Sequence, residues 1–135
     1  MPWGYFDGAS QGEGAHAWGG FILNLSQQHA YLVKIGMGYE TKNWPEALAC
    51  RSLIFFTIEK GCDKILIYGD SMLVVNWVNV VQHCKNIHLV NIVDDIRNCV
   101  FLLHTSLASI SIGTGIRKLI SFLRVTFSWI ASSSR

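Results

Sequence analysis

Residues 69–79 read Gly69-Asp70-Ser71-Met72-Leu73-Val74-Val75-Asn76-Trp77-Val78-Asn79, and this stretch decides the fold more than any other. It follows a short apolar run, residues 64–68, of the type found in buried strands. It then continues into a helical pattern whose apolar face is Leu73, Val74, Trp77, Val78 and Val81. Asp70 therefore stands where a buried strand gives way to a helix, a position at which ligand sites collect in open sheets. Asp70 or Ser71 also suits the N-cap of that helix.

Two further acids occupy comparable junctions. Asp7 lies in Tyr5-Phe6-Asp7-Gly8-Ala9-Ser10, within a strand predicted over residues 4–10. Glu46 lies in Asn43-Trp44-Pro45-Glu46-Ala47-Leu48, where Asn43 is a plausible N-cap and proline is tolerated in the first helical turn. We expect this helix to run to about Lys60 and to stop at Gly61.

Three separated carboxylates of this kind fit a divalent metal site. A carboxylate placed in an apolar strand is costly to bury unless it is neutralised. Hard cations such as Mg²⁺ take oxygen ligands, and a pair of them can clamp the attacking and leaving oxygens of a phosphodiester. Each acid also has an ordinary explanation, namely a turn dipeptide at Asp7-Gly8, the helix dipole at Glu46 and a helix cap at Asp70.

The predicted order of elements is β-β-β-α-β-α-α. Strand patterns over 4–10, 17–25 and 30–37 suggest an antiparallel meander, and the strand at 64–68 follows the first helix. A last helix over 89–103 places six apolar residues on one side: Leu89, Ile92, Val93, Ile96, Val100 and Leu103. We therefore predict an α/β fold, with a mixed sheet of three antiparallel strands followed by alternating helices and a parallel strand.

Composition limits the class of protein. The chain has 135 residues, half of them apolar and 15% charged, which suits one domain with a real core and excludes a disordered segment. The net charge of +2 does not by itself indicate a nucleic-acid partner. Cys50, Cys62, Cys84 and Cys99 lack zinc or disulfide spacing, so we expect free thiols in a reducing, intracellular compartment, nuclear or cytoplasmic. No secretory signal or membrane-spanning stretch is visible, and we expect no membrane partner.

The pattern GDS-x-LVVNW-x-N, together with FDGAS and TKNWPEALA, resembles the ribonuclease H family, most closely the plant RNase H-like domain of retroelement reverse transcriptases. The resemblance covers residues 4–103 and implies an RNase H-like fold. It assigns Asp7, Glu46 and Asp70 to three of the family's four catalytic, metal-binding carboxylates, which hold two Mg²⁺ ions, with Mn²⁺ as a substitute. The implied activity is endonucleolytic hydrolysis of RNA in RNA–DNA hybrids by a monomeric enzyme.

The resemblance also places Thr41 and Asn43 at a segment that contacts the minor groove of the hybrid. Lys42 and Pro45 depart from the family pattern, and the two residues equally fit a turn and a helix cap.

The end of the chain, residues 104–135, differs from the rest. It holds four basic residues (Arg117, Lys118, Arg124 and Arg135), no acid and many serines. The resemblance implies a last strand, a loop and a helix carrying the fourth acid, and none of these is visible. Codons for 109–125, however, when read from their third base, can encode HIYRDGNKEADFLSKG, which matches the family's end.

We therefore interpret 1–103 as an RNase H-like domain and 104–135 as an atypical tail, the out-of-frame version of the last strand and helix. The break falls between about Val100 and Ser109, and the fourth acid's codon straddles Leu119 and Ile120. An apolar stripe still predicts a helix over 116–125. The alternatives to an active nuclease are a catalytically inactive nucleic-acid-binding module and a non-functional translation product.

Overall fold

The computed structural model describes residues 2–10, 17–26, 29–38, 43–69, 71–103, 107–109 and 127–133. Its strands are β1 (Trp3–Ser10), β2 (Ala17–Ser26), β3 (His29–Gly38), β4 (Leu66–Gly69), β5 (Leu107–Ser109) and β6 (Phe127–Ser133). Its helices are α1 (Asn43–Glu59), α2 (Met72–Val78) and α3 (Val90–Leu102). The predicted order from the first strand to the last helix is confirmed; boundaries shift by one or two residues, except that α2 ends three residues earlier than expected.

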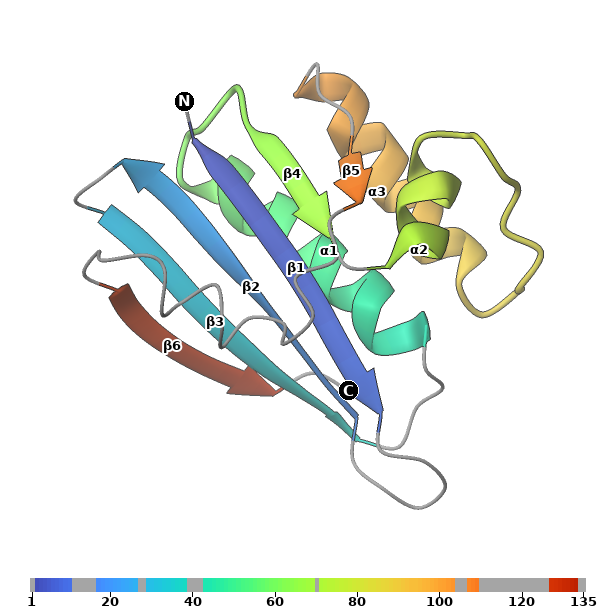
Figure 1. Cartoon of the computed structure of the whole chain (residues 1–135), viewed down its shortest axis with the longest axis horizontal. Coiled ribbons are helices and arrows are strands. Elements are labelled where there is room, and N and C mark those ends of the chain that lie inside the picture. The colour runs from blue at the N-terminus through green and yellow to red at the C-terminus, as the bar shows by residue number, and fades with distance from the viewer. Residues whose placement is uncertain are drawn as a thin grey trace.

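The strands form one mixed sheet in the order β5-β4-β1-β2-β3-β6 (Figure 1). β1, β2 and β3 make the predicted antiparallel meander, and β4 adds to β1 in parallel. β5 then pairs with β4 in parallel, and β6 pairs in parallel with β3 at the opposite edge. The mixed α/β fold class is therefore confirmed, and the C-terminal part contributes one strand at each edge of the sheet.

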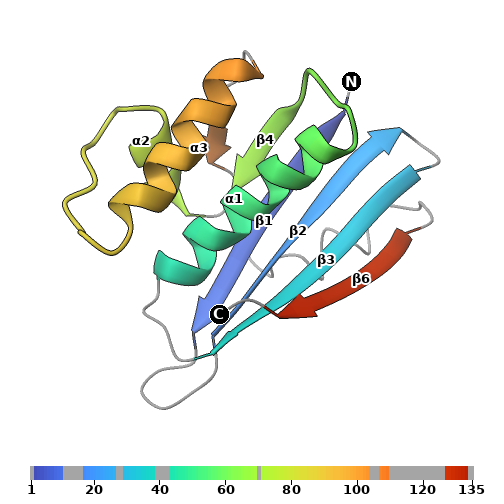
Figure 2. The same ribbon diagram turned by 180° about the vertical axis from the view of Figure 1, so that it is seen from behind.

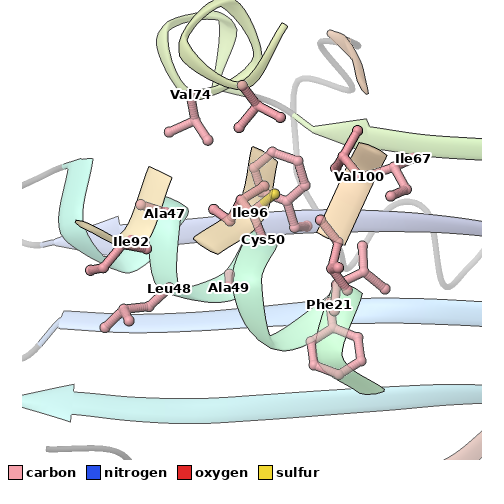
Figure 3. Packing of buried hydrophobic residues seen from close by; sticks show 14 of the residues in the cluster. Phe21, Ala47, Leu48, Ala49, Cys50, Ile67, Val74, Ile92, Ile96 and Val100 are labelled. Atoms are coloured by element: carbon pink, nitrogen blue, oxygen red, sulfur yellow. The ribbon is translucent and has the colours of Figure 1, made fainter. Parts of the chain in front are cut away.

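Helix α1 lies along β1 and β2, with α3 beside it (Figure 2). Phe6 and Phe21 are paired across β1 and β2 and belong to the core on the α1 side, where Gly4 and Gly8 of β1 also face the helix. Figure 3 shows labelled side chains of α1, α2 and α3 meeting those of the sheet in one cluster. The apolar stripe predicted for α3 is confirmed, because all six of its residues are buried: Leu89, Ile92, Val93, Ile96, Val100 and Leu103.

The central strands are buried on both faces. Successive residues of a strand point to opposite sides of the sheet, so Tyr5 and its partner Ile22 lie on the face away from Phe6 and Phe21. Tyr5 and Ile22 are nevertheless 1% and 0% exposed. The middle of β1 therefore lies in the interior of the molecule, and Asp7, which follows directly, is half-buried.

The end of α2 departs from the sequence-based expectation. The helix stops at Val78, and Val81, which we placed on its apolar face, is exposed. Val80 has a φ of 62°, its N–H donates to the Trp77 carbonyl, and the Val81 N–H donates to the Asn76 carbonyl. This left-handed helix ending is normally built on glycine. The prediction for Val81 was wrong because the helix ends before it, and a valine at position 80 does not indicate such an ending in the sequence. Arg97 of α3 reinforces this end, since its guanidinium donates twice to the Trp77 carbonyl, at 2.9 and 2.7 Å.

The four cysteines are free thiols, as expected. Cys50 is fully buried in α1, and burial raises the pKa of its thiol well above the usual range. Burial, followed by the Asp95 carboxylate, also raises the pKa of Cys99. Neither thiol is placed to act as a nucleophile at neutral pH, because the thiolate is the reactive form.

Two strands of the described structure belong to residues 104–135, namely β5 and β6. The helix predicted over 116–125 lies outside the described residues, and the division of the chain at Leu103 stays a prediction. Among the helices that the structure describes, none is long and apolar enough to cross a membrane.

Replacing Val80 with glycine should stabilise the protein. A left-handed conformation costs a non-glycine residue on the order of 1–2 kcal/mol, and Val80 is too exposed to lose much packing, so we expect a net gain of about 1 kcal/mol. Val81→Gly is the matched control, because Val81 is also exposed but lacks the positive φ; it should give no gain. Urea unfolding of the three proteins measures both effects, and equal changes in the two variants would contradict the explanation.

Candidate functional site

Asp7 lies at the point where the partners of β1 change. The parallel pairing of β1 with β4 ends at Phe6 and Gly69, whereas its antiparallel pairing with β2 continues to Ser10 and Ala17. Asp7 is half-buried, and its Oδ1 accepts a hydrogen bond of 2.8 Å from the N–H of Gly8. Because β1 continues for three residues beyond Asp7, the turn explanation of Asp7-Gly8 is excluded.

Glu46 lies in the first turn of α1. The helix begins at Asn43, and Glu46 is only 9% exposed although it is charged. The N-terminal end of a helix carries partial positive charge from its N–H groups, which stabilises a carboxylate there. This explains why an acid is tolerated at a buried position, and it is compatible with a second role for the same carboxylate.

Gly8 brings these two acids into neighbouring positions. A Cβ atom at residue 8 would lie 2.6 Å from the backbone nitrogen of Glu46 and 2.7 Å from the carbonyl carbon of Pro45. Such distances are far below van der Waals contact, so a side chain at residue 8 would not fit. The backbone of β1 and the first turn of α1 are in direct contact here because residue 8 is glycine. Asp7 and Glu46 each stand next to this contact in their own element.

The two carboxylates can share a ligand only at the edge of β1. Alternation puts Asp7 and Gly8 on opposite sides of the sheet, and α1 lies on the Gly8 side. A ligand common to Asp7 and Glu46 would have to sit beside β1 beyond its last pair with β4, where Gly8 presents no side chain.

Asp70 and Thr41 lie outside the described residues. The residues that flank Asp70 are described: Gly69 pairs with Phe6, and Ser71 caps α2 by accepting a hydrogen bond from the Val74 N–H at 3.2 Å. A Cβ at Gly69 would lie 2.2 Å from the Phe6 ring, so glycine is required there as well. Asn43 is the first residue of α1, and its side chain is outside the described part of the structure.

Sequence reasoning missed the roles of Gly8 and Gly69, both of which were read only as neighbours of an acid. One pattern could have indicated these roles. Each glycine stands beside a carboxylate in or at the end of an apolar strand, and glycine in a strand often marks a close approach of another backbone. Among the described residues no three His, Cys, Asp or Glu side chains form a group able to hold a metal ion. That search covers Asp7 and Glu46 but does not include Asp70.

The other polar candidates have structural roles. Asp95 on α3 forms an ion pair of 3.3 Å with Arg51 on α1, and Asp94 pairs with Arg97 at 3.6 Å. All four side chains are partly exposed, so each pair contributes little to stability. His83 and His88 are exposed.

The fold is that of ribonuclease H. RNase H1 from the halophilic archaeon Halobacterium salinarum NRC-1 superposes with a TM-score of 0.74 at 23% identity, over 84% of this chain and 87% of that one. LC11-RNase H1, solved in complex with RNA/DNA hybrid, gives 0.75 at 17% identity, over 87% and 90%. The N-terminal RNase H domain of rv2228c from Mycobacterium tuberculosis gives 0.70 at 16% identity, over 90% and 94%. No family model and no curated protein matches the sequence.

Replacing Gly8 with alanine should destabilise the protein by about 2 kcal/mol, because the methyl group meets backbone atoms that cannot rotate away. Gly4→Ala is the matched control on the same strand. Its methyl group would meet only the flexible end of the Leu53 side chain, at 2.8 Å, so we expect a smaller loss. Chemical denaturation measures both; a Gly4 variant as damaged as the Gly8 variant would argue against a special contact at Gly8.

Proposed function

We propose that this chain binds RNA–DNA hybrids and that Asp7, Glu46 and Asp70 hold two Mg²⁺ ions, or Mn²⁺ in their place, for hydrolysis of the RNA strand. We further propose that hydrolysis by this chain is weak or absent. The observation that carries the proposal is the direct contact of Gly8 with Pro45 and Glu46, because Asp7 precedes Gly8 in β1 and Glu46 is itself part of the contact. The fold in which this contact occurs is shared with RNase H1 enzymes.

The donor set suits the proposed ions. Carboxylate oxygens are the ligands that Mg²⁺ and Mn²⁺ prefer, and two acids on separate elements can approach one ion from different directions. Asp70 directly follows Gly69, and Asp7 directly follows Phe6. Phe6 and Gly69 form the last residue pair between β1 and β4. Chain connectivity thus supports Asp70 as the third ligand.

When bound, the two ions supply a nucleophilic water and stabilise the attacking and leaving oxygens of the phosphodiester. The protein's own contribution is to position acids that repel each other when no cation is present. Glu46 is held by the rigid first turn of α1, and Asp7 is held by the pairing of β1 with β2 and by the N–H of Gly8. A site built on a strand and a helix start keeps its geometry better than one built on loops.

Hybrid is the nucleic acid that the comparison favours, because LC11-RNase H1 was solved with RNA/DNA hybrid. Thr41 and Asn43 immediately precede the first turn of α1 that carries Glu46, and we propose them as groove contacts. The small net charge of the chain agrees with recognition by shape and local contacts rather than by a strong overall field.

The missing acid limits catalysis. Where the family has its fourth carboxylate, this chain carries the apolar residues Leu119 and Ile120 if the tail is read out of frame, and neither can bind Mg²⁺. Hybrid binding without cleavage is therefore the second candidate function. Binding and cleavage assays on the same hybrid distinguish the two.

Mg²⁺ should raise the melting temperature, because it relieves the repulsion among the acids in the folded state. At ten times its dissociation constant a ligand adds about 1.4 kcal/mol, or roughly 5 °C for a chain of this size. Asp70→Asn should reduce the rise, whereas Asp63→Asn, which changes an exposed acid before β4, should keep it. Differential scanning fluorimetry with and without the metal is the measurement, and an unchanged rise in the Asp70 variant would place the metal elsewhere.

Restoring the reading frame, so that the chain ends in HIYRDGNKEADFLSKG, should raise hybrid cleavage by orders of magnitude. The physical reason is the return of a fourth oxygen ligand to the metal site. Cleavage of a labelled RNA strand in a hybrid, followed on a denaturing gel, measures the difference. The restored chain carrying Asp70→Asn is the inactive control. Full activity of the chain as written, or a gene whose second frame lacks this segment, would overturn the proposal.

A further inference from the structure

The last residue pair between β1 and β4 joins a large side chain to a position without one. The parallel register runs from Trp3 and Leu66 to Phe6 and Gly69. Phe6 is 0% exposed in the core, and Gly69 is buried as well. A Cβ atom at residue 69 would overlap the Cε2 and Cζ atoms of the Phe6 ring and lie 2.8 Å from its Cε1 atom. The far end of the ring therefore occupies the space that a side chain at residue 69 would take.

Gly69 is required for space and not for an unusual backbone conformation. Among the described glycines a positive φ occurs at Gly61 and not at Gly69. The Phe6 ring is also enclosed on its other side, because Phe6 pairs with Phe21 on β2 and both are buried in the same cluster. Protein interiors are close-packed, so a ring enclosed in this way yields only when its strand or its neighbours move.

This pair immediately precedes two of the proposed metal ligands. Asp7 follows Phe6 in β1, and its carboxylate accepts a hydrogen bond of 2.8 Å from the Gly8 N–H. Asp70, which lies outside the described residues, follows Gly69 in the chain, so its Cα atom is one peptide unit, about 3.8 Å, from that of Gly69. A displacement at the pair is therefore passed to each acid over a single residue.

We propose that Phe6 and Gly69 are positioning residues for the metal site. The ring packed over Gly69 sets the separation of β1 and β4 at the last pair before Asp7 and Asp70, and thereby the distance over which the two acids can share an ion. This inference rests on the proposed function, since it concerns the same acids. It adds two apolar residues that bind no metal themselves and yet determine how tightly the metal binds.

The physical reason is the strict geometry of the ion. Mg²⁺ holds its oxygen ligands at about 2.0–2.1 Å in a nearly ideal octahedron, and a site loses its function when its ligands move by more than about 0.5 Å. Bringing a methyl group at residue 69 to ordinary contact distance from the ring requires a displacement on the order of 1 Å. A displacement of that size exceeds what the site tolerates.

Two substitutions test whether the pair acts as a unit. Phe6→Leu deletes Cε1, Cε2 and Cζ, the same three atoms that would meet a Cβ atom at residue 69. The methyl group of Gly69→Ala therefore has room in the Phe6→Leu background and has none in the wild-type background. If the pair positions the acids, the two effects are not additive, and the double variant binds metal better than Gly69→Ala alone.

Thr57→Ala is the control for loss of stability alone. Thr57 is 0% exposed and lies one turn beyond Leu53 in α1, away from the end of the helix that carries Glu46. Truncating it leaves a cavity in the core and should lower stability without disturbing the pair of Phe6 and Gly69.

The test is a titration of the whole chain and each variant with Mn²⁺ alone, without nucleic acid, in which the electron paramagnetic resonance signal of the free ion gives the bound fraction. We expect Gly69→Ala to raise the dissociation constant by about tenfold or more, the range seen for residues that orient metal ligands. The double variant should recover most of this loss, and Thr57→Ala should bind as wild type does at a temperature where it is folded. Wild-type affinity in Gly69→Ala, or a double variant that binds no better than Gly69→Ala, would refute the positioning role.

The same titration decides two further outcomes. If Gly69→Ala does not fold, Phe6→Leu decides, because a loosened pair should bind Mn²⁺ more weakly than wild type and an unchanged affinity refutes the inference. Asp7→Asn separates this inference from the proposed function. When wild type binds Mn²⁺ more tightly than Asp7→Asn does, the metal site is present and the Phe6 and Gly69 variants alone decide. Equal binding by wild type and Asp7→Asn removes the metal site and the inference with it.

Discussion

The arrangement of the molecule depends on how closely α1 approaches β1. At Gly8 the strand backbone touches the first turn of α1, and at Gly4 the same face admits the end of the Leu53 side chain. A third glycine, Gly69 at the end of β4, leaves room for the Phe6 ring. These contacts fix the helix along the strand and the end of β4 against β1, and Asp7 and Glu46 stand next to the first of them.

The same close packing explains how the acids are tolerated. The middle of β1 is buried on both faces, Asp7 is half-buried, and Glu46 is 9% exposed at the start of a helix. A carboxylate in such surroundings has few water molecules to stabilise it, so the helix N-terminus, neighbouring N–H groups or a cation must do so. The same residues thus contribute to the stability of the fold and to the proposed metal site, and a change at Gly8 should affect both.

The features that could be predicted from the sequence are those with a periodic or local pattern. The stripe of α3, the end of α1 before Gly61 (φ 74°) and the cap at Ser71 all follow from spacing or from one residue's conformational preference. Val80 could not be predicted, because a left-handed valine has no sequence pattern. Gly8 was read as half of a turn, since the contact that requires it comes from residues 45 and 46, far along the chain. β6 was missed because its pairing with β3 joins distant segments.

Among the residues whose burial the structure describes, the core lies at or before Leu103. The two strands that follow extend the sheet at its edges, and β5 also contacts α2. The fourth acid of the family, in contrast, belongs to the end of the chain. On the interpretation that the frame shifts between Val100 and Ser109, the three proposed ligands are kept and the fourth acid is lost. A chain of that kind could bind hybrid without cleaving it, which is why binding and cleavage have to be measured separately.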